Sequence, residues 1–130
     1  MMNRGIWKEV TSTFEGTLEQ LPPLLAGEGF GILTQIDVQE TLKKKIGVDF
    51  RRYRILGACN PKLAHQALSL DLGIGLLLPC NFVVYERDDG GTTVGAIDPL
   101  ESIGGAAGAG FQELAATVRG KLERVVAGLR

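Results

Sequence analysis

The chain has few of the residues that cross-link small proteins or bind metals, since its 130 residues include two cysteines and one histidine. Two cysteines are too few for a disulfide scaffold, and without a CxxC spacing a zinc site would need carboxylates or a second subunit. An excess of one charge is also missing, because 14 basic residues stand against 15 acidic ones and the net charge is −1. This balance provides no basic field that would attract nucleic acid or an anionic membrane.

Long apolar runs are absent as well. The longest, residues 72–78, is far too short to span a bilayer, and the N-terminus lacks the apolar stretch of a secretory signal. We therefore expect a cytoplasmic protein with no nucleic-acid or membrane partner. The remaining composition is ordinary for a globular chain, with 45% hydrophobic and 22% charged residues. It predicts a single domain over residues 1–130 with one core.

The first half of the sequence alternates between patterns typical of strands and of helices. We expect strands at residues 6–11, 30–36 and 52–59, followed by helices that begin at Ser12, at Asp37 and at Asn60-Pro61. Glycines end the first two of these helices. Pro22 and Pro23 stand inside the first helix, and because neither has an N–H to donate we expect a kink or a restart there.

The second half predicts a hairpin and a long closing helix. We expect a central strand at residues 76–85, an Asp-Asp-Gly-Gly turn at 88–91, a returning strand at 92–97 and a loose glycine-alanine connection at 102–110. Asp98-Pro99 is typical of a helix cap or of a turn. Apolar residues from Phe111 to Leu129 recur every three or four positions, as in an amphipathic helix. The order β-α-β-α-β-α-β-β-α favours an α+β fold, a two-layer sandwich with helices packed on one mostly antiparallel sheet.

Two Cys-Asn pairs stand within the most distinctive motifs of the chain, YRILGACNPKLA at residues 53–64 and GLLLPCN at 75–81. Further motifs are GFGILTQID at 29–37, VGAIDP at 94–99 and KLERV at 121–125. Together they make the chain similar to the domain-of-unknown-function family 302. The resemblance implies an α+β fold similar to the TATA-binding-protein-like sandwiches, and a homodimer. Because no activity is assigned to the family, it implies no reaction, and the proline pair and the loose residues 104–110 depart from its pattern.

Cys59, Asn60, Cys80, Asn81 and Asp98 are the candidate site residues. A thiolate and neighbouring amides that face one cavity would bind or modify a small molecule. The structural alternative is that each cysteine packs as a small hydrophobe, with the Cys80 pKa raised by apolar surroundings, and that Asn60 caps a helix. Asn81 fits this alternative least, because a buried amide must find partners. We therefore expect Asn81 to border a pocket that also touches Cys80 or Cys59.

The distance between the two thiols depends on how the chain returns after Cys59. A right-handed crossover would make the strand of Cys80 parallel to the preceding one and put the thiols beyond disulfide reach. We expect no metal site and no cofactor, since His65 is the single histidine and fits a surface position. The basic cluster Lys43–Arg54 either receives an anionic ligand or guards an edge strand.

A nucleophile–base pair, a metal-ligand set and a phosphate-binding loop are all missing from the sequence. We therefore predict a homodimeric, non-catalytic module that binds a small ligand or a partner. A sheet face left open by a two-layer fold would expose side chains such as Leu77 or Val83, and such patches mark interfaces. The alternative is a cysteine-dependent enzyme that uses Cys80 or Cys59, with the neighbouring asparagines or Asp98 as polar partners.

Overall fold

The computed structural model describes residues 4–105 and 110–130. Its sheet has five strands, β1 (Ile6–Val10), β2 (Gly31–Asp37), β3 (Tyr53–Cys59), β4 (Cys80–Glu86) and β5 (Thr92–Ala96). The strands lie in the order β1-β5-β4-β3-β2, and each neighbouring pair is antiparallel. The predicted order of elements and the predicted α+β architecture, with helices packed on an antiparallel sheet, are confirmed.

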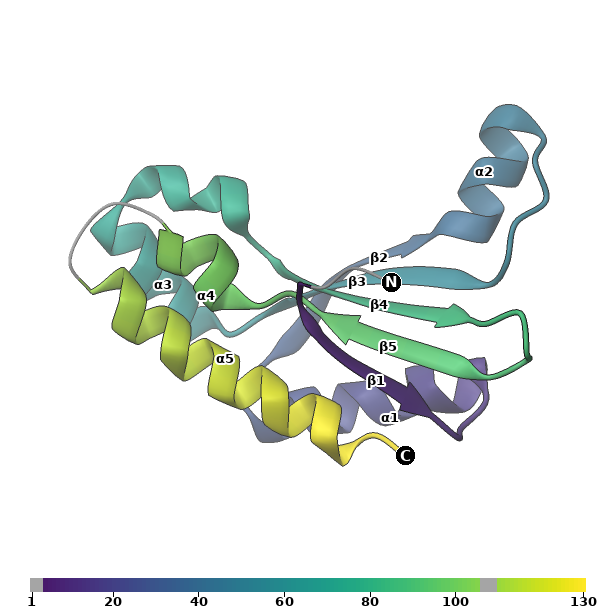
Figure 1. Ribbon diagram of the computed structural model, residues 1–130. Helices are drawn as coiled ribbons and strands as arrows, with labels where there is room; N and C mark the ends of the chain where they lie inside the picture. Colours follow the sequence, from purple (N-terminus) through teal and green to yellow (C-terminus); the bar gives the residue numbers. More distant parts are fainter. Residues whose placement is uncertain (1–3, 106–109) are drawn as a thin grey trace.

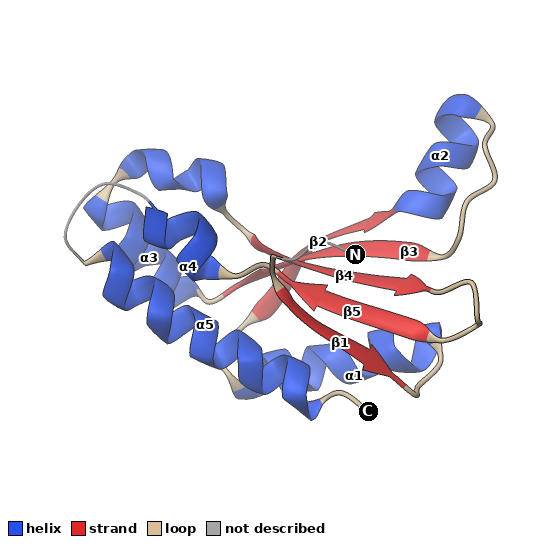
Figure 2. Cartoon of the chain, in the orientation of Figure 1, coloured by secondary structure: helices blue, strands red, loops and turns tan. Residues whose placement is uncertain are grey.

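The helices are α1 (Phe14–Gly27), α2 (Val38–Ile46), α3 (Pro61–Leu70), α4 (Pro99–Ser102) and α5 (Phe111–Gly128), with 3-10 segments η1 (Leu72–Leu77) and η2 (Ile103–Gly105). In Figure 1, α1 and α5 lie against one face of the sheet, and no helix of the described chain covers the other face. Figure 2 shows α3, α4 and η1 gathered beyond the end of the sheet at which β4 begins, whereas α2 projects from the opposite end. The sheet therefore has one covered face and one open face.

Alternation along the strands sends one set of side chains into the layer between the sheet and the two long helices. Phe82, Val84 and Val94 of the central strands are fully buried there. The predicted stripe of α5 is confirmed, because its apolar residues from Phe111 to Val125 are buried against this layer and the neighbouring cluster around α3. Each fully buried side chain of this kind contributes about 1.5–3 kcal/mol.

Three of the predicted helix starts are confirmed by side-chain caps. Asp37 accepts from the Glu40 N–H at 3.0 Å, Asn60 from the Leu63 N–H at 3.3 Å, and Asp98 from the Leu100 N–H at 2.9 Å. Each cap satisfies a backbone donor that the first helical turn leaves without an acceptor. The starts of these helices are therefore determined by hydrogen bonds between residues two or three positions apart in the sequence.

The first helix has a different cap from the predicted one, and it does not restart at its prolines. Its N-cap is Thr13, which accepts from the Gly16 N–H at 2.9 Å, and not Ser12. The helix runs without a break from Phe14 to Gly27, through Pro22 and Pro23. Each proline removes one backbone hydrogen bond, whereas the apolar face of α1 is buried on both sides of them, and this burial holds the helix together.

The apolar run at 76–85 is divided between two elements, so the prediction of a single strand there is wrong. Residues 72–77 form η1, and the Asp71 carboxylate accepts from the Gly73 N–H at 2.8 Å at its start. β4 begins only at Cys80, because Pro79 has no N–H to donate to the ladder. Of the expected connection at 102–110, residue 102 ends α4, 103–105 form η2, and 106–109 lie outside the described residues.

Candidate functional site

The structure divides the five candidate residues between two cavities. Cys59, Asn60 and Cys80 border a cavity of about 30 Å³ between the end of the sheet and α3. Asn81 and Asp98 border a second cavity, of about 350 Å³, on the open face. Cys80 and Asn81 are consecutive residues of β4, and because side chains alternate along a strand the two point to opposite faces.

Two expectations about this strand need correction. Asn81 is exposed and not buried, since neither long helix covers its face. The chain also does not return in a parallel crossover, because β3 and β4 are antiparallel with Ala58 opposite Cys80. This pairing brings Cys59 to the same small cavity as Cys80, and both are free thiols.

The smaller cavity has the properties of core packing. Burial, followed by the nearby Cys59, raises the pKa of the Cys80 thiol to about 11. Such a thiol is protonated at neutral pH and is a poor nucleophile. Both polar groups of the Asn60 side chain are hydrogen-bonded within the fold. Its carbonyl oxygen accepts from the Leu63 N–H at 3.3 Å, and its NH2 group donates to the Glu28 backbone carbonyl oxygen at 3.2 Å. A volume of about 30 Å³ is also far below that of ligand pockets.

The floor of the open-face cavity is a tryptophan that lies across a glycine. Trp7 of β1 is opposite Gly95 of β5 in the ladder, and a Cβ atom at Gly95 would overlap the indole ring. The missing side chain therefore lets the indole cover the neighbouring strand. The indole Nε1 donates to the Arg4 carbonyl oxygen at 2.5 Å, and this hydrogen bond orients the ring.

Val83 and Tyr53 continue the cavity across β4 and β3. Tyr53 stacks on Tyr85, with ring centroids 5.3 Å apart and ring planes 5° apart. Partial burial, followed by the neighbouring Tyr85, raises the pKa of Tyr53, so its hydroxyl stays neutral at physiological pH. The centre of the cavity is therefore aromatic and uncharged.

The charged groups that line this cavity are paired. Glu101 accepts from the Gly5 N–H at 3.1 Å through Oε1, and its Oε2 lies 3.4 Å from Nε of Arg4. Asp98 is only 8% exposed, caps α4 and lies 3.3 Å from the Arg119 guanidinium. The carboxylate of Asp98 is thus occupied by contacts within the protein, where it holds the start of α4 and Arg119 in place.

Asn81 carries a polar side chain that the fold leaves free at this cavity. Its backbone carbonyl accepts from the Ile97 N–H at 3.0 Å, but its amide makes no hydrogen bond within residues 4–105 and 110–130. A primary amide offers two donors and an acceptor. A ligand on the indole floor would therefore find its directional contacts at Asn81.

The floor and wall of this cavity are formed by residues that no motif in the sequence indicated, namely Trp7, Gly95 and Tyr53. One signal was present, because glycine inside a strand marks the close approach of another group. The residue that approaches this glycine could not be predicted, because Trp7 belongs to a strand more than eighty positions away in the chain. The cavity is built by long-range strand pairing and not by a local motif.

Two other features of the sequence lie on the surface. His65 is exposed on α3, as expected. In the basic cluster, Lys43 pairs with Asp49 at 2.8 Å and Lys44 with Glu40 at 2.6 Å. Across the described ranges, no group of three or more His, Cys, Asp and Glu side chains is placed to hold a metal ion. No helix in that part of the chain is long and apolar enough to cross a membrane.

Comparisons with known proteins agree along almost the whole chain. Residues 6–129 match the family described as "Domain of unknown function DUF302". A similar solved structure is that of an uncharacterized conserved DUF302 protein from Bacillus stearothermophilus, 33% identical with a TM-score of 0.90, which covers 99% of this chain and 100% of that chain. No curated protein matches the chain. The chain therefore belongs to the DUF302 family.

Proposed function

We propose that the chain is a small-ligand-binding module without catalytic activity of its own, and that the ligand lies in the open-face cavity. The observation that supports this most is the floor of the cavity, where the Trp7 indole lies across Gly95. Glycine at this position presents an aromatic surface to the cavity instead of filling it with a side chain. The cavity volume of about 350 Å³ is within the range of small-molecule sites.

The chemistry of the walls favours a flat, uncharged ligand with one hydrogen-bonding group. Trp7 and Tyr53 offer aromatic surface against which a planar molecule packs well. The free amide of Asn81 offers the directional contact. At the rim, Arg4 and Glu101 offset each other's charge, so ionic attraction for a ligand is small. An aromatic ligand that carries a hydroxyl or carbonyl group meets these conditions.

Trp7 is the single tryptophan of the chain, so its emission reports directly on the floor of the cavity. We expect 2-naphthol, a flat aromatic alcohol, to change this emission saturably. Asn81→Ala should weaken binding about fivefold, because it removes one hydrogen bond of about 1 kcal/mol. Cys59→Ala, at the other cavity, is the matched control and should bind like the wild type. A change in emission that does not saturate would contradict the proposal.

We also propose that the chain is a homodimer that associates through its open sheet face. Ile55, Val83 and Tyr85 alternate onto this face and are partly exposed. Apolar patches of this kind mark interaction surfaces. Sedimentation at micromolar concentration should give twice the chain mass of 13.9 kDa, and a monomer at that concentration would contradict the proposal.

The alternative function is that of a cysteine-dependent enzyme. It is supported by the position of Cys59 and Cys80, which border one cavity. The raised pKa of Cys80 and the small volume of that cavity weigh against it. Labelling of the native protein with a disulfide reagent separates the two functions. Rapid labelling of either thiol at neutral pH favours the enzyme, and slow labelling of both favours the binding module.

A further inference from the structure

Residues 38–52, which comprise α2 and the connection that follows it, form an arm that stands away from the rest of the fold (Figure 1). None of the residues of α2 is buried. Val38, Leu42 and Ile46 recur every four residues and share one side of the helix. Ile46 is 66% exposed, and Val48 and Phe50 continue the apolar surface. Because so short a helix depends on packing for its stability, this stripe requires a partner.

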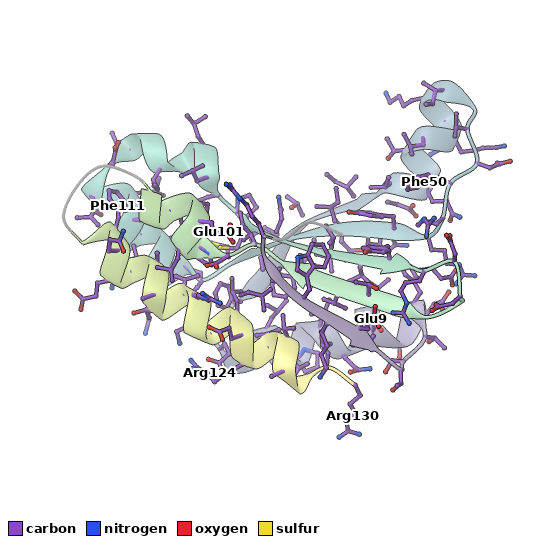
Figure 3. The ribbon with its side chains drawn as sticks, viewed as in Figure 1. Glu9, Phe50, Glu101, Phe111, Arg124 and Arg130 are labelled. Carbon is purple, nitrogen blue, oxygen red and sulfur yellow. The ribbon has the colours of Figure 1, made fainter. Side chains whose placement is uncertain are left out.

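A second apolar surface, the leucine segment of residues 70–77, lies at the opposite end of the strands. Leu72 is 86% and Leu76 is 92% exposed, and two further leucines of the segment are exposed as well. Eight of the nine exposed large apolar side chains in the described chain belong to this segment, to the arm, or to Ile36 at the base of the arm. Figure 3 marks the two ends, with Phe50 in the arm and Glu101 in α4.

The open face between them is too small to form a stable interface by itself. Strands about 4.8 Å apart and at most seven residues long give a face of roughly 400 Å². A stable dimer buries about 800 Å² on each partner. The arm and the leucine segment, which flank the face at its two ends, can supply the missing apolar area. A second copy of the chain offers the same three surfaces in return.

Symmetry and charge decide which of these surfaces meet. Two copies can face each other through their sheets with a two-fold axis between the sheets and perpendicular to the strands. Rotation about this axis reverses the direction of the strands, so the arm of each copy lies over the leucine segment of the other copy. An axis along the strands would place arm beside arm. The arm carries five basic residues against its own two acidic ones and against Glu15 and Asp88, which pair with Arg52 and Arg51. That arrangement therefore brings together two surfaces that each keep one positive charge in excess. The leucine segment has Asp71 as its one charged residue, so it offers a negative charge to the arm.

We infer that α2 of a second copy closes over the open-face cavity, with its apolar stripe on the leucine segment. The cavity of one copy has a floor in Trp7 and a wall in Tyr53 but is open to solvent above them, so the site is incomplete without the second copy. The ligand part of this inference rests on the proposed function. The contact between arm and cavity is testable without any ligand.

Trp7 provides the ligand-free readout. Ile46→Glu leaves the core untouched, because Ile46 is exposed, and should sediment as a monomer. Acrylamide should quench Trp7 about twofold more efficiently in this variant than in the wild type, since the core of an interface excludes solvent. Thr41→Glu adds the same charge about 100° around the helix from the stripe and should behave like the wild type. A dimeric Ile46→Glu, or equal quenching in both proteins, overturns the inference.

Charge complementation identifies the surface that the arm meets. Ile46→Lys and Leu76→Glu should each be monomeric, and their equimolar mixture should form a heterodimer, because it keeps one native contact and gains one Lys–Glu contact. Failure of the mixture to associate, with both variants folded by circular dichroism, overturns the arrangement of arm on leucine segment.

Binding of 2-naphthol separates this inference from the proposed function. Weaker binding by Ile46→Glu than by the wild type supports closure of the site by the second copy, whereas equal binding by both overturns it. If the wild type does not bind 2-naphthol and the quenching and mixing results hold, the proposed ligand is wrong and the contact between the two copies stands.

Discussion

The indole of Trp7 occupies the space that a side chain at Gly95 would fill. The two residues face each other across β1 and β5, and the indole N–H is held by the Arg4 carbonyl oxygen. The Arg4–Gly5 segment is held in turn by Glu101 of α4. The Trp7 indole and its neighbours thus connect β1, β5 and α4. Because of this arrangement, the open face of the sheet has a cavity there and is not flat.

Gly95→Ala should displace the indole, because the new methyl group overlaps the ring. We expect a loss of about 1–3 kcal/mol in the free energy of unfolding, as for other overpacked sites. Trp7 emission should shift to longer wavelength, and 2-naphthol binding should be lost. Urea denaturation and emission spectra measure these effects. An unchanged spectrum would mean that the indole does not cover Gly95 in solution.

Gly27→Ala is the matched glycine control. Gly27 is the last residue of α1, and a Cβ atom there has nothing within 4 Å. Because alanine favours the helix over glycine, the free energy of unfolding should stay the same or rise by up to about 1 kcal/mol. Trp7 emission should not change.

Asn60→Ala should destabilise the protein by about 2 kcal/mol, since it removes an N-cap and a second hydrogen bond of about 1 kcal/mol each. The second bond joins the start of α3 to the Glu28 carbonyl oxygen just after α1. Asn60→Asp keeps the acceptor for the Leu63 N–H and loses the donor to Glu28, so its stability should lie between those of Asn60→Ala and the wild type. Equal losses in the two variants would show that the cap itself contributes nothing.

The stability of the protein should decrease between pH 9 and 11 through Cys80. In the unfolded chain this thiol has its ordinary pKa of 9.0, whereas burial raises the native pKa to about 11. Between these values the native state binds more protons than the unfolded state, so the free energy of unfolding falls as pH rises. The contribution is complete below pH 9 and lost above pH 11, and it is on the order of 2 kcal/mol.

Two cysteine variants isolate this effect from the other groups that titrate at high pH. Cys80→Ala lowers stability at neutral pH by leaving a small cavity, but its free energy of unfolding should fall less steeply between pH 9 and 11. Cys59→Ala removes the smaller of the two causes that raise the Cys80 pKa. The free energy of unfolding of this variant should therefore fall with pH almost as steeply as that of the wild type. Urea denaturation at several pH values gives the slopes, and identical slopes in Cys80→Ala and the wild type would contradict the prediction.

Local chemistry in the sequence predicted much of the fold, because caps and turns depend on nearby residues. Asp37 and Asn60 cap the helices that follow them, as their positions indicated. The choice between Ser12 and Thr13 could not be made in this way, since both carry a hydroxyl. Ser12 instead donates to the carbonyl oxygen of Arg130 at 2.5 Å, at the far end of the chain. Only the folded arrangement decides which hydroxyl is available as a cap.

The sequence of β4 does not reveal which of its faces is covered. Phe82 and Val84 face the long helices, whereas Val83 and Tyr85 face the open side. All four are large and apolar, so the strand has the pattern of one buried on both faces. The positions of α1 and α5 determine the covered face, and these come from packing across the whole chain. Asn81 was expected in the core for this reason. The pocket expected beside it was placed at Cys59 and Cys80, whereas the cavity that Asn81 borders lies on the other face of the sheet.

Asn81→Ala should change the free energy of unfolding by no more than about 0.5 kcal/mol, as expected for an exposed side chain. Its amide makes no hydrogen bond to the described chain, so removing it leaves no partner unsatisfied. Phe82→Ala, one residue further and on the covered face, should cost about 3–5 kcal/mol because Phe82 is fully buried. Urea denaturation of the two variants tests the assignment of faces directly. A loss above 2 kcal/mol in Asn81→Ala would mean that the amide is bound within the fold or within the dimer, and is not available to a ligand.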